Sequence, residues 1–279
     1  MWLRAKKRVY LDWAAAAPVS PRVGHIFQKA LLAYGNPGAL HAEAVAGKKI
    51  LEDARARIAR LAEVKSSRVI FTSGATEANA LGILGVVHAR IKAGSKASEL
   101  HVLYHPAAHA SVIGAVAMLR EEGVHTEPLA VAGSAIDIAG FEKQLRPETV
   151  LVVLEAVSGE TGERYDTLAV RRVLDAYHKK HAVRVRMHVD ASQAPLELSF
   201  TLAHLGADLV SLDAQKVGGI RGCGVLLLRS GVTLTPLMRG GGQEQGLRPG
   251  TENPALATAF ALALEECQNA RAGFSDRAL

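Results

Sequence analysis

Apolar residues recur along this chain in two patterns, one typical of amphipathic helices and one typical of buried strands. The segment Gly47–Val64 places Ile50, Leu51 and Ile58 on one helical face, with arginine and glutamate on the other. Similar patterns predict helices at 76–91, at 109–123 and from Pro254 onward. Short, nearly continuous apolar runs instead predict strands that are covered on both faces. These runs lie within 67–74, 99–106, 149–162, 183–193, 207–212 and 223–229.

The alternation of strands and helices predicts an α/β protein. We expect a three-layer α/β/α domain with a mainly parallel sheet covered by helices on both faces. Polar clusters follow four of the expected strands, and they read TSGATE, SGETG, DASQ and DAQK. Because ligands of such sheets gather beyond the carboxyl ends of the strands, these clusters should open toward one side of the sheet.

Composition narrows the class of protein. With 279 residues and 49% hydrophobic content, the chain suits one large domain or two small ones. The net charge of +6 would suit an acidic partner, but the densest basic cluster, Arg171–Arg186, lacks interleaved aromatic residues. We therefore expect that cluster to be a solvated helix running into a strand, and no nucleic-acid partner.

Targeting and cysteine signals are weak. No apolar run approaches the roughly 18 residues that span a bilayer, and Asp12 interrupts the apolar core that a secretion signal would need. The two cysteines, Cys223 and Cys267, form neither a disulfide framework nor a metal-binding spacing. The sequence thus predicts a cytoplasmic protein with no membrane span and no metal site.

Three features could together hold a phosphorylated, carbonyl-containing cofactor, although each has a plainer interpretation. The stretch FTSGATEANALG predicts a strand, a tight turn and a helix start, which suits phosphate, but Ser73 or Thr76 could simply cap the helix. Asp190 ends a strand and could serve the site or cap a turn. Lys216 ends a later strand and could be a solvated lysine. A Schiff-base lysine, a carboxylate for a pyridine nitrogen and a phosphate-binding helix start are what pyridoxal phosphate requires.

Motifs spread over nearly the whole chain make it resemble the cysteine desulfurases of the class V aminotransferase group, which are fold-type I pyridoxal-phosphate enzymes. These motifs are VYLDWAAAAPVSPRV, YGNPGALH, VIFTSGATEANALGILG, AAHASV, HVDASQAP, ADLVSLDAQKVGGIRGCGVLLLR and GGGQEQGLRPGTEN.

The resemblance implies a role for each matching residue. Lys216 would form the Schiff base with pyridoxal 5'-phosphate, Asp190 would pair with the pyridine nitrogen, and Gln193 would reach the ring's phenolic oxygen. His109 would stack on the ring and move a proton. The remaining implied contacts, all to the phosphate, come from Ala75, Thr76 and, across a homodimer interface, Thr251.

Several positions depart from the family pattern. Ser158 stands where the family usually has an asparagine that contacts the ring oxygen. Asp213 and Gln215 replace a serine and a histidine that help to hold the phosphate. Gln215 can still donate a hydrogen bond, but an ionised Asp213 repels a phosphate dianion, so it must point away, be protonated or weaken the site.

The family's nucleophilic cysteine and its substrate-binding arginine belong to a C-terminal region that this sequence does not contain. We expect Cys223 to be packed in the core, and no catalytic cysteine is assigned. The expected organisation is an N-terminal arm (1–14), a cofactor-binding domain (15–262) and the start of a connector helix (263–279).

The function implied is that of a cysteine desulfurase, which converts L-cysteine to L-alanine and supplies sulfur for iron–sulfur clusters or thio-cofactors through an acceptor or scaffold protein. This chain alone should bind the cofactor and not desulfurate cysteine. Two alternatives stay open: another class V lyase or aminotransferase, or a truncated or split partner subunit without activity of its own.

Overall fold

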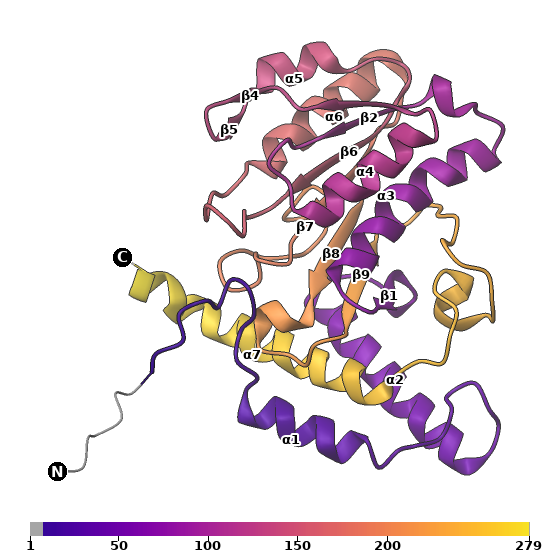
Figure 1. The fold of residues 1–279 in the computed structure, drawn as a ribbon, viewed down its shortest axis with the longest axis vertical. Helices are drawn as coiled ribbons and strands as arrows, with labels where there is room; N and C mark the ends of the chain where they lie inside the picture. The colour runs from indigo at the N-terminus through magenta and orange to yellow at the C-terminus, as the bar shows by residue number, and fades with distance from the viewer. Residues whose placement is uncertain (1–7, 279) are drawn as a thin grey trace.

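A seven-stranded sheet forms the centre of the computed structural model, which describes residues 8–278 (Figure 1). Residues 1–7 of the expected N-terminal arm and residue 279 of the expected connector lie outside that range. The strand order is β1-β9-β8-β7-β6-β2-β3, and β9 alone runs opposite to the other six strands. The strands are β1 (Val69–Thr72), β2 (His101–Tyr104), β3 (His125–Pro128), β6 (Thr149–Glu155), β7 (Arg186–Asp190), β8 (Leu209–Asp213) and β9 (Gly224–Leu228), with β4 (Val131–Ala132) and β5 (Ala135–Ile136) forming a separate small hairpin.

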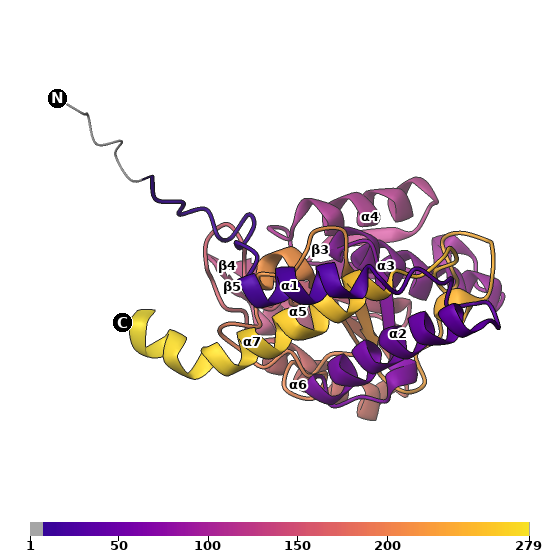
Figure 2. The ribbon, with the colours of Figure 1, turned by 90° about the horizontal axis from the view of Figure 1, so that it is seen from below.

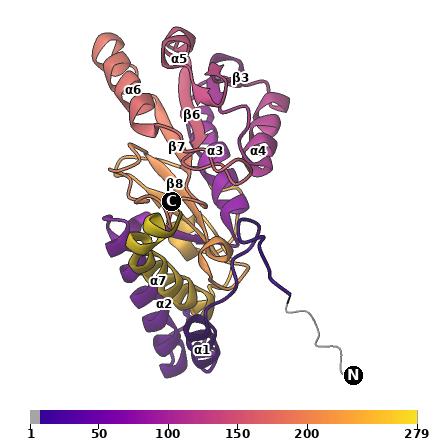
Figure 3. The same cartoon turned by 90° about the vertical axis from the view of Figure 1, so that its left-hand side faces the viewer.

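Helices cover both faces of the sheet, which confirms the expected three-layer α/β/α architecture. Figure 3 shows α2, α6 and α7 on one side of the sheet and α3 and α4 on the other. Helix α1 packs against α7, and Figure 2 shows the two helices side by side. The helices are α1 (Pro21–Ala30), α2 (Ala42–Leu61), α3 (Ala75–Lys92), α4 (Ala110–Glu121), α5 (Ile138–Gln144), α6 (Thr167–His181) and α7 (Pro254–Ala278), with short 3-10 turns η1 (Ser66–Arg68), η2 (Ala97–Glu99), η3 (Ala214–Val217) and η4 (Gln243–Gly246).

Alternating strand residues build two separate apolar cores. In β6, Val152 and Leu154 pack under α2, α5, α6 and α7, whereas Leu151 and Val153 pack under α3 and α4. Each of these side chains is fully buried. Strands buried on both faces are therefore apolar at almost every position, which is the pattern from which the sequence predicts them.

The first long helix begins earlier than its apolar pattern predicts. Helix α2 starts at Ala42 because the His41 side chain caps it by accepting a hydrogen bond from Ala44 N–H (3.3 Å). Gly47 lies inside the helix, where a Cβ atom would be 2.7 Å from the Gly35 carbonyl oxygen. Gly47 therefore permits a close approach of two backbone segments and does not begin the helix.

The basic segment behaves as the sequence predicts. Helix α6 ends at His181, Ala182 adopts a left-handed conformation, and β7 begins at Arg186. Within residues 8–278, no helix is both long and apolar enough to cross a membrane.

Candidate functional site

Four strands end at the same edge of the sheet. β1, β6, β7 and β8 run in one direction because β9 is antiparallel to both β1 and β8. The four polar clusters follow the carboxyl ends of these strands, so they open on one side, as predicted. A cavity of about 550 Å³ lies beyond the ends of β7 and β8, and its walls include Trp13, Ser192, Gln193, Lys216 and Cys267.

Lys216 lines this cavity rather than extending into open solvent. Its Nζ donates hydrogen bonds to the carbonyl oxygens of Ala14 (2.6 Å) and Ala15 (3.0 Å). The amide of Gln193 donates to the same Ala14 oxygen (2.9 Å). The structure thus brings Lys216 and Gln193 together under one turn of the N-terminal segment.

Two glycines explain how the chain turns directly behind the lysine. Gly218 ends η3 with φ at +77°, a left-handed conformation that glycine adopts without strain. A Cβ atom on Gly219 would lie 2.7 Å from the Ala214 carbonyl oxygen, so no larger residue fits there. The glycine pair therefore sets the position of Lys216 relative to β8.

Asp190 is a buried carboxylate held by two donors. It accepts hydrogen bonds from the Asn79 side-chain amide (2.6 Å) and from Ser192 N–H (2.9 Å). The Asn79 oxygen in turn pairs with His188 Nε2 (2.9 Å). Burial lowers the pKa of His188 to about 4, so its ring is neutral. Because Nε2 faces the Asn79 oxygen, which can only accept, the ring proton lies on Nε2. His188 therefore orients Asn79 so that the amide N–H points at Asp190.

The same amide connects this carboxylate to His109. Asn79 also donates to the Ser111 hydroxyl (2.9 Å), which contacts His109 Nδ1 (2.8 Å). His109 caps α4, and its Nδ1 accepts a hydrogen bond from Ser111 N–H (3.1 Å). Nδ1 thus acts as the acceptor in this contact, and Nε2 is the ring nitrogen that is not used by Ser111.

Glu155, at the end of β6, is a second buried carboxylate in the site. It accepts the backbone N–H of His109 (2.7 Å) and pairs in register with Asp190 on β7. Burial, together with the charges of Asp190 and Glu160, raises the pKa of Glu155 to about 7. Glu155 is thus a group in this site that changes charge near neutral pH.

Asp213 points at the turn that is expected to bind phosphate. Its Oδ2 accepts the Ala75 N–H (2.8 Å) at the start of α3, and its Oδ1 accepts the Gln215 N–H (3.0 Å). Of the three arrangements that the sequence leaves open, pointing away from the turn is therefore wrong. Thr76, the next residue of α3, is exposed.

The Ser158 side chain forms hydrogen bonds within its own loop. Its hydroxyl accepts hydrogen bonds from the N–H groups of Glu160 and Thr161 (3.3 Å each), and the residue is buried. A Cβ atom on the neighbouring Gly159 would lie 2.9 Å from the Gln193 amide nitrogen, so the loop approaches the Lys216 cavity. The short serine side chain caps this turn.

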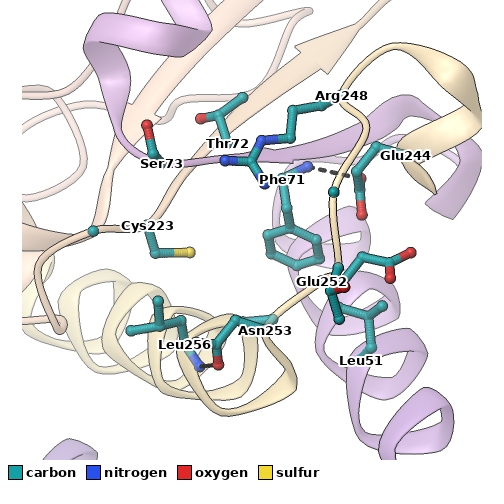
Figure 4. Close-up of a pocket in the computed structure, with 14 residues that line it drawn as sticks. Leu51, Phe71, Thr72, Ser73, Cys223, Glu244, Arg248, Glu252, Asn253 and Leu256 are labelled. Atoms are coloured by element: carbon teal, nitrogen blue, oxygen red, sulfur yellow. Dashed lines mark hydrogen bonds between the residues drawn. The ribbon is translucent and has the colours of Figure 1, made fainter. Parts of the chain in front are cut away.

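Thr251 lies on a different cavity from Lys216. This second cavity, of about 170 Å³, is also lined by Thr72, Ser73, Cys223 and Arg248 (Figure 4). Thr251 is exposed. Within one chain, therefore, the structure does not bring Thr251 to the Lys216 cavity. Gln215 lies between Asp213 and Lys216 in η3 and is partly exposed.

The loop that carries Thr251 is anchored to the domain by buried charges. Glu244 accepts two hydrogen bonds from the Arg55 guanidinium (2.7 Å each) and one from Phe71 N–H (2.8 Å), the last drawn in Figure 4. Arg248 pairs with Glu77 of α3 (2.9 Å). The Arg55–Glu244 pair is buried, and removing one member of a buried pair is costly, so it holds the loop against α2 and β1. The partly exposed Arg248–Glu77 pair adds a link to α3.

Both cysteines are buried, as expected for Cys223. Burial, with the charges of Asp213 and Glu244, raises the pKa of the Cys223 thiol well above its usual range, and burial raises that of Cys267 to about 12. A thiol in this state is a poor nucleophile. The described residues also contain no cluster of three metal-ligating side chains.

Four residues of this site were missed by sequence reasoning: Asn79, Ser111, Glu155 and His188. Glu155 could have been identified from the sequence, because the strand is apolar after its first residue and Glu155 is its one charged residue. Asn79 could also have been identified, because it is a polar residue among the apolar residues of a mostly apolar helix. His188 acts through Asn79, and Ser111 links His109 to Asn79, so the partner that brings each into the site is distant in the sequence and no local pattern marks it.

Comparisons with known proteins show the family to which the chain belongs. The family model described as "Aminotransferase class-V" matches residues 9–277. "Cysteine desulfurase IscS 1" of Archaeoglobus fulgidus is 30% identical over 262 residues, which are 92% of this chain and 64% of that protein. "Cysteine desulfurase, mitochondrial" of Arabidopsis thaliana is 32% identical over 262 residues, 92% of this chain and 55% of that protein.

Solved structures show the same fold. A "NIFS-LIKE PROTEIN" superposes with a TM-score of 0.88 at 30% identity and covers 96% of this chain and 71% of its own. "SspA in complex with cysteine" superposes with a TM-score of 0.83 at 30% identity, and the match covers 92% of this chain and 72% of that chain. The chain thus spans less than two thirds of the Archaeoglobus fulgidus protein and slightly more than two thirds of these two solved chains.

Proposed function

Because this chain belongs to the class V aminotransferase family, we propose that it is the pyridoxal phosphate-binding part of a cysteine desulfurase. The observation that carries the proposal is the shared cavity of Lys216 and Gln193 beyond the end of the strand that carries Asp190. An amine, an amide and a carboxylate that is buried and accepts two hydrogen bonds form the set of groups that a pyridine aldehyde requires.

The residues present fit this cofactor on its ring side. When bound, pyridoxal phosphate supplies an aldehyde and a protonated ring that withdraws electrons from an amino acid. Lys216 would hold the aldehyde carbon and later move protons. Asp190 would keep the ring nitrogen protonated, and Asn79 holds Asp190 in place for that role. Ala75, Thr76 and Gln215 would bind the phosphate.

His109 and Gln193 would act on the other parts of the ring. His109 would stack on its face and exchange a proton at Nε2, which the contact of Nδ1 with Ser111 leaves available. Gln193 would donate to the phenolic oxygen, and Ser158 stands where a second contact to that oxygen is expected. The carbonyls of Ala14 and Ala15 hold the Lys216 amine in the cavity until the cofactor binds.

The whole reaction would convert L-cysteine to L-alanine and pass the sulfur, as a persulfide, to an acceptor or scaffold protein for iron–sulfur clusters or thio-cofactors. A relative that is 30% identical has been solved with cysteine bound, which supports this substrate. We place residues 15–262 in the cofactor domain and 263–279 in a connector to a small domain that would supply the nucleophilic thiol. A cytoplasmic homodimer, with Thr251 reaching the partner's phosphate, completes the proposal.

A second candidate is another class V lyase or aminotransferase, whose chemistry needs no enzyme thiol. The observation that favours it is the state of the two cysteines, both of which are buried with a raised pKa. A truncated or split partner subunit without activity of its own is the third.

An absorbance titration tests the proposal. Purified protein titrated with pyridoxal phosphate should develop the visible band of the lysine-bound cofactor. Lys216→Ala should not develop it, whereas Lys48→Ala, which removes an exposed lysine of α2, should. If wild type and Lys216→Ala both lack the band, the proposal fails.

The same samples, mixed with a panel of amino acids, separate the candidates. L-cysteine should perturb the band most, without sulfide or alanine accumulating, because both thiols of the chain are buried and protonated. Strong sulfide release would contradict that expectation, and a larger response to another amino acid would favour the second candidate.

A further inference from the structure

The turn expected to hold the phosphate already contains a negative charge that belongs to the chain itself. Asp213 is buried, and its two oxygens accept the N–H groups of Ala75 and Gln215 at 2.8 Å and 3.0 Å. Ala75 is the first residue of α3, so its N–H points outward from the positive end of an 18-residue helix. The carboxylate therefore takes one of the donors that an anion at this helix start would use.

The surroundings hold the carboxylate closely. A Cβ atom on Gly74 would be 3.1 Å from Asp213 Oδ2, and one on Gly224 would be 2.5 Å from the Gly74 carbonyl carbon. Asp213 also caps η3, the turn that carries Lys216, through the Gln215 N–H. Moving the carboxylate away from α3 would thus leave two backbone donors unpaired in a packed region.

A phosphate dianion at this turn faces both competition and repulsion. The Ala75 N–H carries one hydrogen, which is already bonded to Asp213. Two anions in a partly buried site repel one another more strongly than they do in water. Burial raises the pKa of Asp213 above its usual value, and its two backbone donors and Lys216 offset only part of that rise.

We propose that Asp213 acts as a built-in anion at the start of α3 and lowers the preference of this chain for phosphorylated over unphosphorylated pyridoxal. The inference rests on the proposed function and deepens it by assigning cofactor specificity to one residue. The ring contacts through Lys216, Asp190 and Gln193 are common to pyridoxal and its phosphate. Any change in the ratio of the two dissociation constants therefore reports on the phosphate end alone.

The test measures dissociation constants for pyridoxal phosphate and for pyridoxal by absorbance titration, at about pH 8 where an ordinary carboxyl is ionised. The principal variant is Asp213→Asn, which keeps the size and an acceptor oxygen but removes the charge. Asp213→Ser is the second variant, so that misfolding of one does not end the experiment. Asp137→Asn is the matched control, because Asp137 also caps a helix, α5, with its side chain.

We expect Asp213→Asn and Asp213→Ser to tighten binding of pyridoxal phosphate by about tenfold or more, because one repulsive pair of charges is removed. Binding of pyridoxal should be unchanged, and Asp137→Asn should behave as wild type with both ligands.

Two results would overturn the inference, and they are distinguishable. If pyridoxal binds but the ratio of the two constants is the same in wild type and in both Asp213 variants, Asp213 does not govern specificity and the proposed function stands. If neither ligand binds to any variant, the proposed function fails, and this inference fails with it.

Discussion

Three carboxylates end three neighbouring strands of this site, and each is held in a different way. Asp190 has a side-chain amide and a backbone donor, whereas Asp213 has two backbone donors. Glu155 has one, the N–H of His109. The least-supported carboxylate is therefore the one whose pKa burial raises to about 7, and Asp190 beside it adds to that effect.

Replacing Glu155 by glutamine should stabilise the cofactor-free protein in a pH-dependent way. The folded protein holds the Glu155 proton more tightly than the unfolded chain does, since the pKa rises from 4.5 to about 7. The wild type therefore loses stability as pH rises through this window, and the full penalty is present above it. Glu155→Gln keeps an acceptor for His109 and should be more stable by about 1–3 kcal/mol at about pH 8, with little difference near pH 4.5.

Urea unfolding at the two pH values measures this difference. Glu142→Gln, at an exposed position of α5, is the control and should show no pH-dependent change relative to wild type. An equal shift of Glu155→Gln at both pH values would contradict the assignment of a raised pKa to Glu155.

At the scale of elements, α3 lies unusually close to the sheet at Gly82. A Cβ atom there would be 2.5 Å from Cε1 and Nδ1 of His188 on β7, whose side chain is fully buried. This close approach lets Asn79, one turn earlier on α3, reach both His188 and Asp190. Gly114 on α4 is different, because nothing lies within 4 Å of the position of its Cβ.

The same substitution at these two glycines should have opposite effects. Gly82→Ala should destabilise the protein by about 1–3 kcal/mol, because the methyl group forces His188 or α3 to move. Gly114→Ala should stabilise it by about 0.5–1 kcal/mol, since alanine favours a helix and meets no neighbour. Thermal unfolding of the two variants measures this contrast. Stabilisation by Gly82→Ala would show that α3 does not pack against His188 as described.

At the scale of the whole molecule, the fold gathers site residues that are separated in sequence by most of the domain. Apolar periodicity predicted the layers, the near-parallel sheet and the common side of the polar clusters, because strands buried on both faces must be apolar throughout. It did not predict β3, an edge strand with polar residues such as His125 and Glu127. It also could not predict that Asp213 faces α3, since that depends on how two distant strands are placed.

The roles proposed for Lys216 and Asp190 rest on motif resemblance rather than on periodicity. The residues that hold Asp190 in place became visible only in three dimensions, because Asn79 bonds Asp190 and His188 orients Asn79. The carbonyls of Ala14 and Ala15, which accept from Lys216, likewise come from a distant part of the sequence. The chain spans 64% of a curated relative, and cofactor binding is the part of the proposed function that we expect the described residues to support.

The most direct test of the account is to find where the cofactor attaches. Purified protein incubated with pyridoxal phosphate is reduced with borohydride, digested and mapped by mass spectrometry. The account predicts one dominant pyridoxyl label, on Lys216, that is absent from Lys216→Ala and retained in Lys48→Ala. Labelling spread over exposed lysines to the same extent in wild type and in Lys216→Ala would contradict it.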